Sequence, residues 1–336
     1  MNRFILALLF ASSTAFSQSP ILKIMSVQTN AAFRGLSVIN DQVAWLSGTN
    51  GWVGKSLDGG KNWKFKQVPG FEQFDFRSLY AFNDQVAIIA NAGSPAHILR
   101  TEDGGETWKV VYKNEHKDAF FDGVDFWNDN EGMLYGDPIE GKLTILKTKN
   151  GGKDWQELSS RPQLNSGEAS FAASGTGIRC FGKNRVMIAT GGQTSRLWIS
   201  DNGGDSWRTI APPIIQGEAA TGIFSVAFAN TASGIVVGGN YQQDSVKNKH
   251  VFYTTDGGSS WKFPSAPTRG YRECVEYLSK LVAIAVGPTG IDITKDGGAR
   301  WLPLSDEKKF HVVRKARKGS LVVVAGHDGR VGLLAR

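Results

Sequence analysis

Cysteine and histidine are scarce in this chain of 336 residues, which contains two cysteines, Cys180 and Cys274, and five histidines. The histidines are scattered and no C-x-x-C pair is present, so no motif has the spacing of a metal site. The Gly-rich segments do not form the G-x-G-x-x-G turn that binds dinucleotides between a strand and a helix. The sequence therefore predicts no metal and no cofactor.

Motifs of covalent catalysis and of helical structure are also missing. Ser170 and Ser174 have no nucleophile-elbow context, so the sequence assigns no catalytic residue. No segment of useful length repeats its apolar residues with a 3.6-residue period, and we expect few helices. The net charge of +7 is spread along the chain, and its densest run, residues 308–318, falls on an expected strand and turn. Nucleic-acid sites need a clustered basic face, so no nucleic-acid partner is predicted.

Long apolar runs are absent, and the apolar segment near the N-terminus, residues 4–10, is too short to span a bilayer. It follows Arg3 and leads to small residues around Ala15, which is the pattern of a secretory signal peptide. We expect residues 1–17 to be removed and the mature chain, residues 18–336, to be exported to the periplasm or the extracellular space without a transmembrane segment.

What the chain has in abundance is glycine, 40 residues, much of it in one recurring motif. Six segments contain a Ser or Thr, then Asp or Asn two positions later, a Gly pair and a closing Trp. They are residues 56–63, 101–108, 148–155, 200–207, 254–261 and 294–301. Successive closing tryptophans stand 40 to 54 residues apart, a period typical of arrays of four-stranded units.

Each motif is expected to form the turn of a β-hairpin. The residues before it, such as 196–200, and after it, such as 63–68, are rich in β-formers. The D-G-G or N-G-G triplet supplies positive φ and short side chains that bond the turn backbone. The Trp then folds back over the turn, where its indole N–H needs a partner.

A seventh unit becomes visible when the strands upstream of the motifs are aligned. Seven segments share a strand, a polar turn and an apolar strand, and the last of them, residues 310–326, is followed by a short strand without a motif. The missing outer strand is supplied by residues 21–28 at the other end of the chain. We therefore predict an all-β fold, a single seven-bladed β-propeller of four-stranded blades, closed by pairing of the N-terminal strand with residues 330–335.

The two cysteines fall on the first strands of units four and six. Because unit five separates these strands, the Cα atoms are expected to lie beyond the reach of a disulfide. The sequence predicts two free thiols.

In a propeller the first strand of each blade lines the central channel, so the starts of these strands meet. The aligned position holds Arg34, Arg77, Asp122, Thr176, Thr221, Arg272 and His311. Arginine suits bidentate recognition of a carboxylate or phosphate group, and such a ring can bind an anionic ligand. The competing interpretation is structural, because charges in a channel also pair with one another.

Four further residues lie on loops that are more elaborate than the repeat requires, and glycines there allow close backbone approach. They are Asp137, Glu168, Tyr241 and Tyr271. With the ring, these loops mark one face of units three to six. The candidate ligand-binding residues are Arg34, Arg77, Asp122, Asp137, Glu168, Tyr241, Tyr271 and Arg272.

The repeated motif resembles the Asp-box of BNR repeats, with Asp58, Asp103, Asn150, Asn202, Asp256 and Asp296 in its third position. Six boxes, seven units and a signal peptide together are similar to the photosystem II stability and assembly factor family. That resemblance implies a non-enzymatic chaperone that binds a protein partner, such as a subunit of a membrane protein, outside the cytoplasm. It covers the whole mature chain at the level of architecture.

A rival interpretation comes from glycosidases, because Asp-boxes also occur in sialidases. On that resemblance Arg34, Arg77 and Arg272 would clamp a carboxylate, and Glu168 with Asp122 or Asp137 would be the paired carboxyl groups of glycoside hydrolysis. The ligand would then be a carbohydrate or a small anion. The chain departs from the sialidase pattern, since Arg34 is followed by Gly35 and Leu36 where sialidases have Arg-Ile-Pro.

Overall fold

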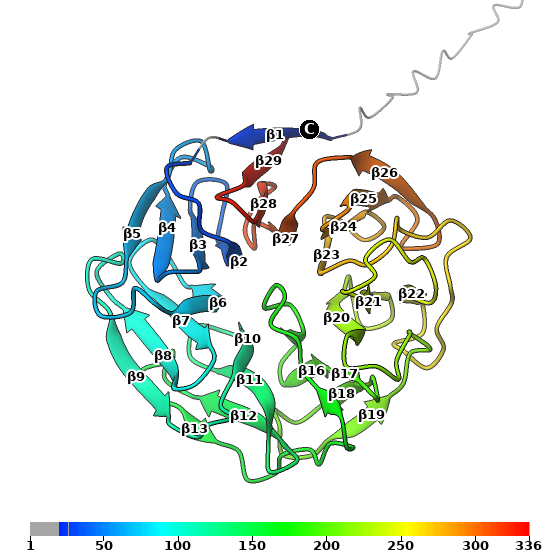
Figure 1. Ribbon diagram of the computed structural model, residues 1–336, viewed down its shortest axis with the longest axis horizontal. Coiled ribbons are helices and arrows are strands. Elements are labelled where there is room, and N and C mark those ends of the chain that lie inside the picture. The colour runs from blue at the N-terminus through cyan, green and yellow to red at the C-terminus, as the bar shows by residue number, and fades with distance from the viewer. Residues whose placement is uncertain (1–19, 26, 336) are drawn as a thin grey trace, which may run out of the picture.

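Seven β-sheets stand side by side around one axis and form a closed ring (Figure 1). The computed structural model describes residues 20–25 and 27–335, and no helix occurs among them, so none there could span a membrane. The predicted signal peptide, residues 1–17, lies outside the described residues and stays a prediction. The predicted fold class, a seven-bladed β-propeller, is confirmed.

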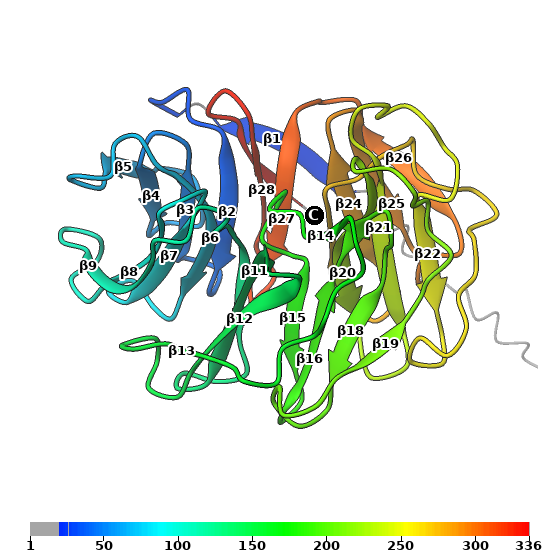
Figure 2. The same ribbon diagram turned by 60° about the horizontal axis from the view of Figure 1, so that its bottom comes forward.

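Each sheet, or blade, is a meander of antiparallel strands that runs outward from the axis, as the tilted view shows (Figure 2). The innermost strands of blades 1 to 7 are β2 (Phe33–Val38), β6 (Asp75–Ala81), β10 (Phe121–Phe126), β15 (Ile178–Phe181), β20 (Thr221–Phe228), β23 (Cys274–Tyr277) and β27 (Phe310–Lys315). The second strands are β3 (Ala44–Gly48), β7 (Ala87–Ala92), β11 (Gly132–Ile139), β16 (Arg185–Ala189), β21 (Gly234–Asn240), β24 (Ala283–Gly287) and β28 (Val322–Gly326).

The third strands lead into the box turns in blades 1 to 6. They are β4 (Trp52–Ser56), β8 (Ala96–Thr101), β12 (Lys142–Thr148), β18 (Leu197–Ser200), β22 (Val251–Thr254), β25 (Gly290–Thr294) and, in blade 7, β29 (Val331–Ala335). The outermost strands are β5 (Lys64–Gln67), β9 (Lys109–Asn114), β13 (Gln156–Glu157), β19 (Arg208–Ile210), β26 (Trp301–Ser305) and, in blade 7, β1 (Ile21–Met25).

Blade 5 departs from the four-stranded plan. Its outermost strand is reduced to a single bridge between Tyr253 and Lys262. At its inner edge it gains two short strands, β14 (Glu168–Ala169) and β17 (Gly191–Gly192), because Gly191 pairs with Gly222. This extra layer comes from the long loop that precedes blade 4 and from the loop between β16 and β18 of blade 4, and it brings both loops to the inner edge of blade 5.

The ring closes where the sequence predicts. β1 pairs antiparallel with β29, from Ile21 opposite Ala335 to Met25 opposite Val331. Figure 1 shows this strand from the N-terminal end lying outside the C-terminal strand. Blade 7 is thus built from both ends of the chain, and its C-terminal edge is covered.

The box turns share one hydrogen-bonding scheme. In the first box, the Ser56 hydroxyl accepts the Gly60 N–H at 2.9 Å and donates to Asp58 at 2.9 Å, while Asp58 accepts the Asn62 N–H at 2.9 Å. The two glycines have φ near +75° and +81°, a region that residues with a Cβ rarely adopt. The predicted role of the triplet is confirmed.

Among the described residues, the expected partner for the indole N–H is found at one of the six closing tryptophans. Trp63 donates to the Gly60 carbonyl at 3.0 Å. The indole nitrogens of Trp155, Trp207, Trp261 and Trp301 are buried and have no hydrogen-bond partner among the described residues. For these four, burial of the ring contributes most of the stabilisation.

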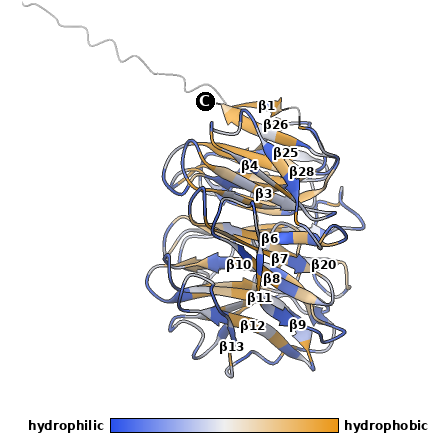
Figure 3. Cartoon of the chain, turned by 90° about the vertical axis from the view of Figure 1, so that its left-hand side faces the viewer, coloured by the Kyte–Doolittle hydropathy of each residue, from blue (hydrophilic) through white to orange (hydrophobic). Residues whose placement is uncertain are grey.

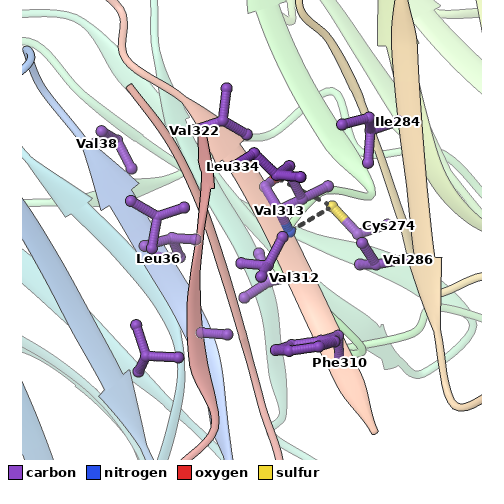
Figure 4. Close-up of a cluster of buried hydrophobic side chains, with 14 of the residues drawn as sticks. Leu36, Val38, Cys274, Ile284, Val286, Phe310, Val312, Val313, Val322 and Leu334 are labelled. Atoms are coloured by element: carbon purple, nitrogen blue, oxygen red, sulfur yellow. Dashed lines mark hydrogen bonds between the residues drawn. The ribbon is translucent and has the colours of Figure 1, made fainter. Parts of the chain in front are cut away.

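The core lies between neighbouring blades, where apolar strand residues face each other across the sheets. Figure 3 shows these apolar residues concentrated in the strands and polar residues in the connecting loops. One cluster joins blades 6, 7 and 1 and contains Leu36, Val286 and Val312 (Figure 4). Both cysteines are free, as predicted, and Cys274 accepts the Val313 N–H in this cluster at 3.4 Å.

Candidate functional site

The inner strands contain a β-bulge near their first residues. In β2, β6, β10, β20 and β27 the pairing register shifts at one residue, and in β23 both Glu273 and Cys274 bond to Val286. A bulge re-aims the side chain of the extra residue. The bulge residues of blades 1, 2, 3, 5, 6 and 7 are Arg34, Arg77, Asp122, Phe224, Glu273 and His311. In blade 4 the register of β15 does not shift, and Thr176 stands at the corresponding position.

Two members of the ring predicted from sequence are therefore wrong. Blade 5 presents Phe224 where Thr221 was expected, and blade 6 presents Glu273 where Arg272 was expected. In blade 6 the alignment is displaced by one residue, and a one-residue shift moves a side chain to the other face of a strand.

Arg272 instead lies inside its own blade. Its guanidinium is fully buried and pairs with Asp292, with 2.9 Å between Nε and Oδ2. It also donates to the Tyr271 carbonyl and the Thr289 hydroxyl, each at 2.7 Å. These contacts tie two segments of blade 6 together and leave this guanidinium no surface for a ligand.

Three bulge residues from blades 1, 6 and 7 form a charged cluster at this end of the axis. Glu273 accepts from Arg34 at 2.8 Å and lies 2.8 Å from the Nδ1 atom of His311. Burial opposes the charge of Glu273, but His311 and Arg34 outweigh it and hold the pKa of the carboxyl below its usual value. The charges of this cluster satisfy one another.

The segment 171–176 crosses the axis at the end where Arg34, Glu273 and His311 meet. We call this end of the axis the plugged end, and the segment the plug. Arg34 donates to the Ala173 carbonyl at 2.8 Å, and the Ser174 hydroxyl donates to the Glu273 carbonyl at 2.9 Å. In Figure 1 this part of the chain is the green loop that reaches toward the centre.

An aromatic cluster borders the plug. Phe171 stacks on Phe224 with ring centroids 3.8 Å apart and an interplanar angle of 8°. Tyr271 meets Phe224 edge-on at 4.7 Å and is buried, whereas Tyr241 lies over the pair and is 49% exposed. Tyr241 therefore presents an aromatic ring to solvent, and the buried Tyr271 packs against Phe224.

Two carboxyl groups of blade 3 differ in burial, since Asp137 is half-buried and lines a cavity. Asp122 is fully buried, and neither of its oxygens has a hydrogen-bond partner among the described residues. Burial and the nearby Asp137 raise the pKa of Asp122 well above its usual value. Asp137 accepts the Ser170 N–H at 2.9 Å, which anchors the start of the plug, and burial raises its pKa. Arg77 pairs with Asp75 at 2.7 Å.

Glu168 is not part of the cluster at the plugged end. Its buried carboxylate pairs with Arg196 and accepts from the Thr190 hydroxyl at 2.6 Å and the Trp198 indole at 3.3 Å. Its surroundings belong to blade 4. The structure thus brings Arg34, Tyr241 and Tyr271 to one aromatic and charged region. It groups Arg77 with Asp122 and Asp137 in blades 2 and 3, and it gives Glu168 and Arg272 separate buried partners.

A second cluster of charged side chains lies at the other end of the inner strands, and the prediction from sequence did not include it. Arg179 pairs with Glu276 at 2.8 Å, and Arg314 approaches the same carboxylate at 3.5 Å. They stand three residues after the ring position of their blades, and Arg179 and Glu276 line a cavity of about 290 Å³ together with Tyr80 and Tyr277. The same repeat alignment, read three residues further along, would have found them. Among the described residues no group of His, Cys, Asp and Glu is arranged to hold a metal.

Comparison with known proteins identifies the family of this chain. A family model described as photosynthesis system II assembly factor YCF48 matches residues 15–116 and 92–211. No curated protein matches the sequence.

Many solved structures share the fold with this chain, and three of them illustrate the similarity. "YCF48 bound to D1 peptide" has 16% identity and a TM-score of 0.69, covering 95% of this chain and 100% of that one. YCF48 from Cyanidioschyzon merolae has 18% identity and a TM-score of 0.67, with coverages of 94% and 99%. A GH74 xyloglucanase from Xanthomonas campestris has 12% identity, a TM-score of 0.57 and coverages of 92% and 60%. Because the family model matches more than half of the sequence, this chain belongs to the YCF48 photosystem II assembly factor family.

Proposed function

We propose that this protein is an exported, non-catalytic binding module that holds a segment of a partner protein against the loop-rich face of blades 3 to 6. The observation that carries the proposal is the surface at the plugged end. There the chain's own segment 171–176 closes the axis and an exposed tyrosine stands over a stacked aromatic pair.

Two features of this surface favour a polypeptide partner. Tyr241 offers a rigid ring with a polar tip, and aromatic residues of this kind are enriched where proteins bind one another. The charges beneath it are already paired within the protein, as in the cluster of Arg34, Glu273 and His311. A small ion would have to displace these pairs, whereas a peptide can bind across them. The relative whose title names a bound D1 peptide supports this class of ligand.

The glycosidase alternative is not favoured by the carboxyl groups. Asp122 and Glu168 are buried, and Glu168 is committed to Arg196. General acid–base chemistry on a glycoside requires two carboxyl groups that flank the substrate. We propose that these side chains serve the fold and the position of the plug.

The test is capture of the partner by the exported protein. Tagged wild type is expected to retain a partner protein from the extracytoplasmic fraction, and Tyr241→Ala should weaken that retention by about tenfold or more, the effect of an aromatic contact in a binding interface. Leu302→Ala is the matched control, because Leu302 is 51% exposed on β26, away from the plugged end. A fluorescently labelled D1 peptide provides a defined first probe by anisotropy.

Three outcomes would contradict the proposal. Equal retention by the Tyr241 and Leu302 variants would move the binding surface elsewhere. Turnover of a glycoside by the wild type that is lost in Arg77→Ala would replace the proposal with the hydrolase. A mature protein in the cytoplasm whose N-terminal sequence still begins before residue 18 would refute the export.

A further inference from the structure

The outer part of the interface between blades 1 and 2 contains a groove of about 310 Å³. Its walls are aromatic and include Trp45, Trp63 and Trp108, with Val53 beside them, and lysines stand at its rim. Trp45 and Trp108 meet edge to face at 6.5 Å. Apolar walls with a few polar groups are typical of sites for small organic ligands.

At this groove one outer-strand residue differs from its counterparts in blades 3 and 4. Lys66 pairs with Val53 in blade 1, as Leu158 bonds to Ile145 in blade 3 and Ile210 pairs with Leu197 in blade 4. The side chains of Leu158 and Ile210 reach the second glycine of the next box and fill the interface there. The neighbours of Gly105, the corresponding glycine of blade 2, are Trp45 and Trp108.

A second residue of blade 1 also differs from its counterparts in the other blades, and here an apolar residue replaces polar ones. The second position of the box is Leu57 in blade 1, whereas the other five boxes have polar residues there, namely Glu102, Lys149, Asp201, Thr255 and Lys295. Leu57 is 52% exposed and lines the groove. Blade 1 therefore has a lysine where blades 3 and 4 have an aliphatic residue and a leucine where the others are polar, and both changes face one groove.

The rim carries three lysines and two carboxylates, Asp58 and Glu106, and Asp58 is hydrogen-bonded within its own box. Lys55 is engaged, since it donates to the Gly104 carbonyl at 2.8 Å and lies 4.9 Å from the Trp45 ring. Lys66 pairs with the exposed Glu106. Lys64 is exposed and forms no ion pair among residues 20–25 and 27–335, which leaves one cation available at the rim.

We propose that this groove is a binding site for a small organic carboxylate, with its apolar body between the tryptophans and its carboxylate at Lys64. The site lies on the outer flank of blades 1 and 2 and is separate from the plugged end. An apolar body gains from burial against the indoles, and a single negative charge complements the rim.

The experiment titrates the full-length protein with 2-naphthoate by calorimetry and compares it with 2-naphthylmethanol, which has a similar body without the charge. Saturable binding of one naphthoate per chain is expected, with the alcohol weaker by about tenfold. Lys66→Leu restores the aliphatic residue of blades 3 and 4 and should abolish naphthoate binding by filling the groove. Lys109→Leu, an exposed lysine on β9 that does not line the groove, is the matched control and should bind as the wild type does.

Lys64→Gln tests the charge without changing the walls, and it keeps the proposal testable if Lys66→Leu fails to fold. It should weaken naphthoate by about tenfold and leave the alcohol unchanged. Absence of saturable naphthoate binding to the wild type would overturn the proposal. Unchanged binding in folded Lys66→Leu, or in Lys64→Gln, would overturn it equally.

Discussion

At the scale of single residues, the box turns explain why Asp and Asn are interchangeable in this repeat. Asn202 uses its Oδ1 atom to accept the Ser206 N–H at 3.0 Å and its amide to donate to the Ser206 hydroxyl at 2.9 Å. Asp103 accepts the Thr107 N–H at 2.9 Å with the same geometry, and its second oxygen accepts from the Thr107 hydroxyl. Only the direction of the outer hydrogen bond changes.

The ionised boxes predict a pH dependence of stability. Hydrogen bonds from the hydroxyl and N–H of the residue four positions later, Thr107 or Ser260, lower the pKa of Asp103 and Asp256 to about 2. An unfolded aspartate has a pKa of about 3.9. The carboxylates therefore stabilise the fold fully above about pH 4, and this contribution is lost as the pH falls through about 2.

The double variant Asp103→Asn with Asp256→Asn should melt near the wild-type temperature at pH 7, because the asparagine boxes have the same turn. Its melting temperature should fall less than that of the wild type between pH 4 and pH 2. Asp129→Asn, outside the boxes, is the control. An equal acid-induced fall in wild type and double variant would contradict this assignment.

At the scale of elements, the register of one short strand decides the role of Arg272. Because β23 is displaced by one residue relative to the sequence alignment, Glu273 occupies the bulge position and Arg272 turns into the blade toward Asp292 on β25. Buried ion pairs contribute little net stability, but removal of one partner leaves an uncompensated charge.

Arg272→Met should therefore lower the free energy of unfolding by about 3–5 kcal/mol, measured by denaturant titration. Arg208→Met removes an exposed partner of Asp201, and its effect should stay below about 1 kcal/mol. A stable Arg272→Met protein that loses its partner protein would instead return Arg272 to the binding surface.

At the scale of the whole molecule, stability depends on the strand from one end of the chain that completes the last blade. Leu22 of β1 packs against the cluster of blades 6, 7 and 1 and pairs with Leu334. Ile21 is its neighbour in the same strand and is 68% exposed. Without β1, the edge of β29 would be free to pair with other chains.

Leu22→Asp should consequently destabilise the protein by about 1–3 kcal/mol and promote aggregation, because a carboxylate would be placed against the apolar cluster. Thermal melting and size-exclusion chromatography measure the two effects. Ile21→Asp has the same chemistry on the exposed face and should behave as the wild type does. Equal behaviour of the two variants would show that the ring does not depend on this strand.

The periodic features were predictable from the sequence because they are local. The box turn needs only a hydroxyl, an Asp or Asn, and two glycines within a few residues, and its six repeats determine the number of blades with a box. The seventh blade and the pairing of residues 21–28 with residues 330–335 followed from counting strands, since an unpaired edge is unfavourable.

Side-chain directions were decided only by the tertiary structure. A β-bulge or a shift of one residue does not change the apolar pattern of a strand, yet it exchanged Arg272 for Glu273 at the axis. The same holds for partners from distant blades: the contacts of Arg34 with Ala173 and Glu273, and of Glu168 with Arg196, depend on loops whose path no local pattern encodes. Local hydrogen bonding thus determined the repeated turns and the number of blades, and long-range packing determined which side chains lie at the axis.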